Sequence, residues 1–466
     1  MKYDPVDLML NCLPQVSKFI RKTCGRLLNQ HNVKFRFKII FKNLKYLFVY
    51  LSIILLFCSP EKSNQVTIDF WAMGAEGEYI GRLIPEFEAR NPDIKVKVQS
   101  IPWSAAHEKL LTAFAGQSTP DVCQLGNTWI PEFQAIGALL ALDSSIAHSS
   151  IIDKNKYFDG IWKTNVIGKN VYGIPWYVDT RLLFYRKDVL TKAGYQTPPK
   201  SWDEWLDLSY KIKNLSSPQQ WRYAVFFSLI YNDWAVPVIL ILCNGGRLLK
   251  NNDCYGAFDD PATLEALRFY MKFFEDSLAI RSMTEVSNMY QGFYDGLFSM
   301  MITGPWNVSE IRKRYPQLKD RWSTATIPAR QNFNSIAGGS SLVLFKNTRH
   351  PMAAWKLIEF LSQPEIQLEF FQLTLDLPAV KAAWNTDEIQ KDQEMAAFYT
   401  QLEHVVPTPK IAEWEQVAVK IQEHLEQVIF GRISLEQAVI NLNRDVNRIL
   451  EKRRWLLSKN LIIGGK

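Results

Sequence analysis

The chain has 466 residues, of which 47% are hydrophobic and 22% are charged. This length is enough to bury two sizeable cores, and the composition is that of a folded globular protein rather than a disordered one. The formal net charge of +7 comes from residues 1–60, which hold ten Lys or Arg against two Asp. The near-neutral remainder argues against nucleic-acid binding, which depends on clustered neutralisation of phosphates.

Residues 1–60 have the pattern of an N-terminal extension followed by an export signal. Basic residues 37–45 lead directly into the apolar run 46–58, which is the order found in signal peptides. The uninterrupted apolar run is about 13 residues, short of the roughly 20 that a spanning helix needs, so a retained anchor is the alternative. The sequence LLFC also resembles a bacterial lipobox, which makes Cys58 a candidate lipidation site. Phe57 departs from that pattern, since a small residue is usual there.

Cysteine and histidine usage indicates neither a metal site nor a disulfide framework. Only Cys123, Cys243 and Cys254 follow the signal, and they show no paired metal-ligand spacing. The histidines are scattered, and the chain has no HExxH, no Walker-type glycine loop and no Gly-x-Ser-x-Gly elbow. We therefore expect no cofactor and no metal. All fifteen Trp lie from Trp71 onward, which is a hint of stacking on an amphipathic ligand.

The first part of the body alternates strand and helix patterns. Strands are predicted over 66–71, 94–101 and 121–126, with helices over 78–90 and 107–116 between them. This alternation favours a parallel sheet with helices on its faces.

Helix-capping signals continue the α/β pattern further along the chain. They are Ser201 with Glu204, Asp260 followed by Pro261, and Ser434 with Gln437. Two helical patterns, 411–430 and 434–457, end the chain. The architecture expected from these patterns is an α/β protein whose C-terminal part is helical.

Seven segments, taken in their order and spacing, resemble the extracellular solute-binding proteins of sugar-type ABC importers, a group that includes maltose- and trehalose-binding proteins. The segments are 84–103, 118–129, 172–205, 243–246, 293–308, 336–362 and 374–384. The resemblance implies an α/β fold of two discontinuous lobes, joined by a hinge, with a ligand cleft between them. It also implies transport without catalysis. The expected protein is a monomer, exported to the periplasm or the outer face of the cytoplasmic membrane, that passes its ligand to a permease with a separate ATPase.

Lobe boundaries follow from the same resemblance. Lobe 1 is expected over 61–178 and 337–377, and lobe 2 over 179–336 and 378–466. The chain is expected to cross between them near 178–181, 328–337 and 376–381. A ligand that engages both lobes favours the closed arrangement, because only that state offers all of its contacts.

A sugar offers hydroxyls to charged or amide groups and C–H patches to aromatic faces. The candidate ligand-binding residues are Glu76, Glu78, Asn127, Trp129, Tyr177, Asp179, Trp234, Trp306, Gly339 and Ser340. The family places a sugar-binding acid in the loop 72–78 and another at the position of Asp179. Related proteins often have Asp where this chain has Gly126, so that acidic contact is in doubt.

Each candidate also has a structural interpretation. Acids favour helix N-termini, which applies to Glu76 and Glu78. Asp179 could order the hinge through an ion pair with Arg181, Trp129 could serve packing, and the glycines at 338–339 could form a tight turn.

Two other classes of protein stay open from the residues alone. One is an exported glycoside hydrolase, for which Glu76 and Asp179 are the only carboxylate pair we can nominate. The other is a structural or adhesive surface protein. The expected ligand is a di- or trisaccharide or a glucosylated polyol, and the sequence does not say which.

Overall fold

The computed structural model describes residues 65–459 apart from 218–221, 231–232 and 287. Residues from Gln65 onward form one compact unit, distinct from the preceding residues. The predicted export signal and Cys58 lie outside the described residues. Within the described part, every helix is too short or too polar to cross a bilayer.

A six-stranded sheet with the order β15-β6-β14-β3-β1-β2 forms the first half of the described body. Its strands are β1 Val66–Met73, β2 Ile94–Ile101, β3 Val122–Gly126, β6 Ile174–Asp179, β14 Gly338–Leu344 and β15 Leu377–Pro378. β1 pairs in parallel with β2 and β3, as the alternating pattern predicts. β14 runs antiparallel to both β3 and β6, so the complete sheet is mixed.

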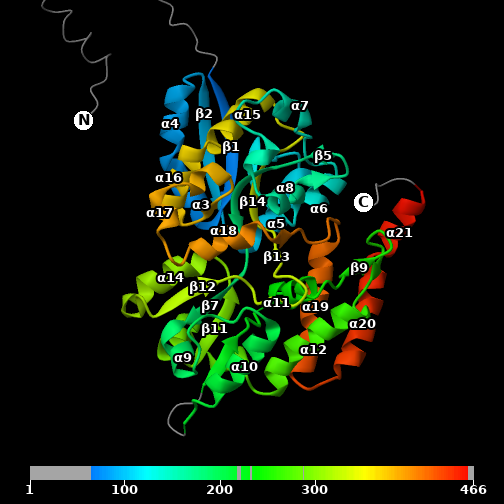
Figure 1. The fold of residues 1–466 in the computed structure, drawn as a ribbon. Coiled ribbons are helices and arrows are strands. Elements are labelled where there is room, and N and C mark those ends of the chain that lie inside the picture. Colours follow the sequence, from blue (N-terminus) through cyan, green and yellow to red (C-terminus); the bar gives the residue numbers. More distant parts are fainter. Residues whose placement is uncertain (1–64, 218–221, 231–232, 287, 460–466) are drawn as a thin grey trace, which may run out of the picture. The chain divides into compact units, whose positions relative to one another are not determined.

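Helices from two separate stretches of the sequence, 74–164 and 351–374, accompany this sheet (Figure 1). They are α3 Gly74–Tyr79, α4 Ile84–Arg90, α5 Trp103–Ala115, α6 Ile130–Ala135, α7 Asp143–Ala147, α8 Asp159–Thr164, α15 Pro351–Leu361 and α16 Pro364–Thr374. The single helix predicted over 78–90 is wrong: a 3-10 turn over Ile80–Arg82 separates α3 from α4. Pro85, in the first turn of α4, has no N–H for a helix that continues from α3.

A four-stranded sheet with the order β12-β7-β11-β8 forms the second half. Its strands are β7 Leu182–Arg186, β8 Tyr223–Phe226, β11 Phe298–Thr303 and β12 Trp322–Ala325. Figure 1 shows β7, β11 and β12 in the opposite half of the described body from β1, β2 and β14. One face of this second sheet packs on a core that includes Leu183, Trp205 and Phe273.

The helices of the second half are α9 Lys187–Lys192, α10 Trp202–Lys213, α11 Ala235–Cys243, α12 Pro261–Glu275, α13 Met289–Asp295, α14 Trp306–Arg314, α17 Asp387–Gln390, α18 Ala396–Leu402, α19 Trp414–Ile429, α20 Leu435–Ile449 and α21 Glu451–Ser458. Three of them, α10, α12 and α20, begin where the capping signals place them. Ser201 and Ser434 each accept a hydrogen bond of 3.2 Å from the backbone N–H three residues on. The last predicted helix divides at Leu450 into α20 and α21.

Short elements complete the described chain. They are β4 Val166–Ile167, β5 Asn170–Val171, β9 Leu249–Lys250, β10 Tyr255–Gly256, β13 Ser335–Ile336, β16 Val405–Val406, and 3-10 turns over Lys154–Lys156, Met283–Glu285, Pro316–Leu318 and Lys381–Trp384.

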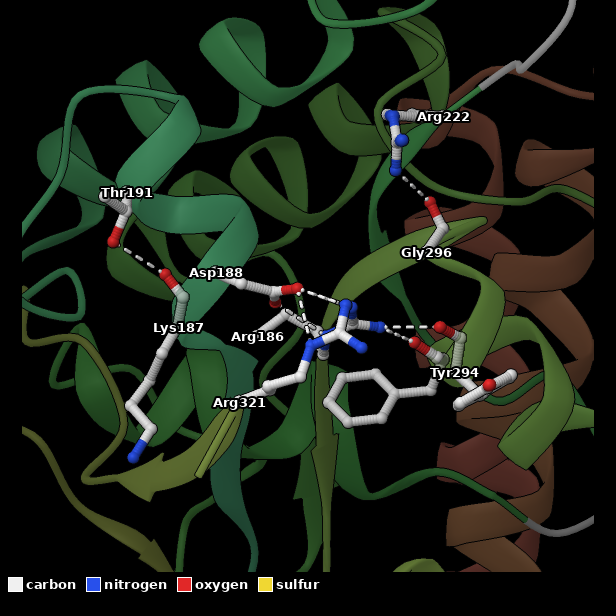
Figure 2. Close-up of polar contacts among 9 residues, drawn as sticks. Arg186, Lys187, Asp188, Thr191, Arg222, Tyr294, Gly296 and Arg321 are labelled. Carbon is white, nitrogen blue, oxygen red and sulfur yellow. Dashed lines mark hydrogen bonds and ion pairs between the residues drawn. The ribbon is translucent and has the colours of Figure 1, made fainter. Parts of the chain in front are cut away.

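A buried guanidinium ties β7 to its neighbouring helices (Figure 2). Arg186, 3% exposed, donates to the carbonyls of Phe293 and Tyr294 at the end of α13. Its Nε and Nη2 atoms donate to Asp188, each at 2.8 Å, and Arg321 donates to the same carboxylate at 2.7 Å. The buried charge is therefore both paired and hydrogen-bonded, which a charge needs when it leaves water.

Two segments that pass between the sheets lie side by side. Thr180 and Arg181 join β6 of the first sheet to β7 of the second, and β13 lies between β12 and β14. The Thr180 hydroxyl donates to the Ile336 carbonyl at 2.9 Å, and the Ser335 hydroxyl donates to the Arg181 carbonyl at 2.9 Å. These bonds couple the two crossings. The lobe ranges predicted from the sequence stay a proposal.

Candidate functional site

A cavity of about 670 Å³ borders these crossings and takes its walls from both halves of the body. Nine of the ten predicted ligand residues line it: Glu76, Asn127, Trp129, Tyr177, Asp179, Trp234, Trp306, Gly339 and Ser340. The tenth, Glu78, lies on the exposed side of α3 and does not line the cavity. The structure thus brings together residues that are more than 260 positions apart in the sequence.

Glu76 belongs to a buried hydrogen-bond network on the first-sheet side of the cavity. The Tyr177 hydroxyl donates to Glu76 Oε1 at 2.5 Å and accepts from the Ser340 hydroxyl at 3.0 Å. Gln124, fully buried in β3, donates to Tyr177 and Ser340, each at 3.2 Å. Its own Oε1 accepts from the Met73 backbone N–H at 2.7 Å, which fixes its orientation. The network presents Glu76 and Ser340 to the cavity in defined positions.

Three carboxylates influence one another at this wall. Burial raises the pKa of Asp376 well above its ordinary value, and the negative charges of Glu76 and Asp179 raise that pKa further. Burial also raises the pKa of Asp179, although the positive charge of Arg181 opposes the shift. Asp376 can therefore hold its proton and act as a hydrogen-bond donor where an ordinary aspartate would only accept.

Four indoles line the cavity: Trp103, Trp129, Trp234 and Trp306. Trp103 at the start of α5 meets Trp129 edge to face, with ring centroids 5.7 Å apart. Trp234 meets Trp414 at 5.1 Å in the same geometry. Trp103 and Trp306 are 37% and 41% exposed, so part of each side chain is open to solvent. Indole faces of this kind suit the C–H patches of a sugar ring.

The Trp129 ring also packs against a titratable side chain, that of His107. The ring of His107 lies 5.1 Å from that of Trp129 and hydrogen-bonds Glu132 at 2.7 Å. This hydrogen bond raises the pKa of His107, while burial opposes the rise. Gly126 leaves the indoles room, since a Cβ there would contact Trp129 at 3.4 Å and Trp103 at 3.8 Å.

Arg181 pairs with Asp179, as the ion-pair interpretation predicts, and it also contacts Trp306. Arg181 Nη1 donates to Asp179 Oδ1 at 3.1 Å, and both side chains are 22% exposed. The Arg181 guanidinium carbon lies 4.4 Å from the centre of the Trp306 ring. The ion pair does not remove Asp179 from the cavity wall, so pairing and ligand contact are compatible.

Backbone geometry explains why position 339 is a glycine, and a side-chain hydrogen bond explains the position of Asn127. Gly339 has φ +114°, and a Cβ there would lie 2.4 Å from the Tyr177 carbonyl oxygen, so only glycine fits. A Cβ on Gly338 would lie 1.9 Å from Asp179 Oδ1. The Asn127 side-chain amide donates to the Ala337 carbonyl at 3.0 Å, which holds the end of β3 against the crossing. Asn127 therefore has a structural role at the edge of the cavity.

Sequence reasoning did not nominate several residues of the cavity wall. They are Trp103, Arg181, Asp233, Glu310, Asp376 and Glu415. Trp103 and Asp376 lie within segments that carry the family resemblance, which is the signal that could have found them. Among the described residues, no group of three or more His, Cys, Asp or Glu is arranged to hold a metal ion.

Two α/β halves joined by crossing segments, with a polar and aromatic cavity beside the crossings, define the class of two-lobed binding proteins. The chain belongs to the bacterial extracellular solute-binding protein family, whose model matches residues 72–368.

Known proteins similar to this chain carry sugar-binding names. The solved structure of the sugar-binding protein MalE from Xanthomonas citri is 43% identical, with a TM-score of 0.81, and the match covers 84% of this chain and 99% of that one. The maltodextrin-binding protein MdxE of Bacillus subtilis is 26% identical over 80% of this chain and 87% of its own length. The galactooligosaccharide-binding protein of the same bacterium is 24% identical over 84% of this chain and 92% of its own length.

Proposed function

We propose that this chain is the substrate-binding subunit of an ATP-driven sugar importer. It captures a di- or trisaccharide, or a glucosylated polyol, between its lobes and delivers it to a membrane permease whose ATPase is another chain. The observation that carries the proposal is the cavity of about 670 Å³, which combines indoles from both halves with the buried, oriented carboxylate of Glu76. This volume lies within the roughly 300–1,000 Å³ of small-molecule pockets.

The names of the relatives support a carbohydrate ligand, since the three reported above bind a sugar, maltodextrin or galactooligosaccharide. The mechanism is binding and lobe closure without chemistry. A ligand that contacts Glu76 and Ser340 on one side and Trp234 and Trp306 on the other stabilises the arrangement in which both sides are close.

The comparisons with known proteins do not support the glycoside hydrolase alternative. Glu76 accepts a hydrogen bond from Tyr177, and Asp179 is paired with Arg181. These contacts hold the two carboxylates in the cavity wall. The family and the relatives are binding proteins.

Binding without turnover is the test. Thermal-shift and calorimetric titrations of the protein with maltose, trehalose, sucrose and glucosylglycerol should identify a ligand that stabilises the fold by about 2.7 kcal/mol at 100 times its Kd. Chromatography of the mixture should recover the sugar unchanged. Release of monosaccharide would favour the hydrolase, and the absence of binding across a broad sugar panel would refute the proposal.

For location, we propose export to the outer face of the cytoplasmic membrane as a monomer, with lipidation of Cys58 as the anchor. The support is the basic and apolar order of residues 37–58. Cys58→Ser should release the protein from the membrane fraction without a change in sugar affinity. A C58S variant that stays in membranes with an intact N-terminus would instead identify the apolar run as a retained anchor.

A further inference from the structure

Arg181 lies where the two halves of the body meet. It is the second of the two residues that join β6 in the first sheet to β7 in the second. Its side chain is 22% exposed and lines the cavity. Among the residues that line this cavity it is the only Lys or Arg, whereas six are Asp or Glu. The sole cation of an acidic wall is therefore placed on the crossing itself.

The guanidinium of Arg181 contacts one predicted ligand residue from each half. It donates to Asp179 Oδ1 at 3.1 Å at the end of β6, and its central carbon lies 4.4 Å from the centre of the Trp306 ring at the start of α14. Within the described residues this is the one hydrogen bond its five N–H donors make to the protein. The remaining donors can serve a ligand that lies against Asp179 and Trp306.

A second, smaller cavity lies beside the Trp306 ring. It measures about 50 Å³ and is lined by Arg181 and Trp306 together with apolar side chains that include Phe226 and Met301. The ring packs over Gly304, where a Cβ would lie 2.0 Å from it, and 41% of its residue surface is exposed. Gly304 and Arg181 therefore both contact the indole, and the contact with Arg181 is the one that links it to Asp179.

We propose that Arg181 is a positioning residue for the ligand, since its guanidinium holds the Asp179 carboxylate and the Trp306 indole as one unit across the crossing. This inference rests on the proposed function, because it assigns Arg181 a role in the same sugar site. A cation is attracted to the face of an indole, so the guanidinium keeps the ring in position before the ligand arrives.

The test compares Arg181→Gln and Arg181→Lys with the parent by titration calorimetry on a sugar that the parent binds. Arg181→Gln keeps much of the side-chain length but removes the charge, so Kd should rise at least tenfold while the ligand-free Tm stays nearly unchanged. Arg181→Lys restores the charge and should recover part of that loss. Arg90→Gln is the matched control, because Arg90 also pairs with an acid, Glu86, and lies over an aromatic ring, Phe360, away from the cavity.

Two further readouts separate positioning from general packing. Removal of Arg181 takes away the charge that opposes the pKa rise of Asp179, so the loss of sugar affinity on acidification should move to higher pH in R181Q. In a double-mutant cycle, R181Q should weaken the binding of Trp306→Ala much less than it weakens the parent, since the two residues act as a unit.

The outcomes distinguish a failure of the Arg181 inference from a failure of the proposed sugar-binding function. If the parent binds sugar and R181Q binds it within twofold, with an unchanged pH profile, the inference fails while the proposed function stands. Additive losses in the R181Q and W306A cycle would also overturn it. A parent that binds no sugar would overturn both.

Discussion

The hydroxyl of Tyr177 donates a hydrogen bond of 2.5 Å to Glu76 although the two residues are 101 positions apart. Both are buried, at 7% exposure each. Burial raises the pKa of Tyr177, and the charges of Glu76 and Asp376 raise it further. The tyrosine therefore keeps its proton and acts as the donor that orients Glu76 toward the cavity.

Tyr177→Phe should destabilise the fold. The change removes the donor to Glu76 and a partner of Ser340 in a buried setting, where unsatisfied groups cost about 1–3 kcal/mol. Urea unfolding measures the loss. Tyr195→Phe is the control, since its exposed hydroxyl bonds Asp207 at 2.6 Å and its removal should cost less than about 1 kcal/mol. Equal losses in both variants would mean that the buried network adds nothing.

Helices and strands can be predicted from the sequence, because capping residues and apolar periodicity act over a few neighbouring residues. Ser201 and Ser434 cap their helices as expected, and the strand over 94–101 is correct at both ends. The prediction of one continuous helix over 78–90 is wrong. It rested on the periodicity of the apolar residues, whereas Pro85 lacks the N–H that a continuous helix needs at that position. The sheet becomes mixed because β14 arrives from more than 200 residues away, which no local pattern encodes.

The candidate site likewise combines residues that the sequence indicates with contacts that only the packing of distant elements creates. The resemblance nominated Glu76, Asp179 and Trp306, and all three line the cavity. The equally plausible Glu78 points away, since two residues along a helix turn a side chain through about 200°. Arg181 was considered only as a partner of Asp179, because its contact with Trp306 depends on how β7 and α14 pack.

Trp306→Ala and Asp179→Asn should each weaken sugar binding at least tenfold. Loss of a stacking face or of a charge-assisted hydrogen bond costs on the order of 1–3 kcal/mol. Trp306 is 41% exposed, so its removal should leave the ligand-free Tm nearly unchanged. Titration calorimetry and thermal unfolding together check both statements. If W306A unfolds the ligand-free protein and D179N binds as the parent does, both residues are structural and the site is misplaced.

Asp188 should make the fold sensitive to acid. Burial alone would raise its pKa, but hydrogen bonds and charges from Arg186 and Arg321 lower it from 3.8 to about 2 (Figure 2). A lowered pKa stabilises the folded state above about pH 4, and this contribution disappears as the pH falls toward 2. We expect on the order of 1–2 kcal/mol after solvent screening of this partly exposed group.

Asp188→Asn isolates that contribution. The difference in unfolding free energy between parent and D188N should be largest near pH 5 and shrink steadily below pH 4, as measured by urea titration at each pH. Asp203→Asn, which removes a carboxylate that is 89% exposed, controls for the general effect of charge. A difference between parent and D188N that stays constant down to pH 2 would contradict the assigned role of the two arginines.

Asp376 should affect stability with the opposite sign. Burial and the charges of Glu76 and Asp179 raise its pKa well above 3.8, so above pH 4 the unfolded chain has released a proton that the folded protein still holds. Folding then takes up a proton, and the stability contributed by this group falls as the pH rises toward the folded pKa.

Asp376→Asn removes the titration and mimics the protonated carboxyl. The Tm of D376N should therefore match the parent near pH 4 and exceed it by a margin that grows toward neutral pH, while Asp376→Ala should lose sugar affinity that D376N keeps. A margin that does not grow with pH would show that Asp376 is already ionised in the folded protein.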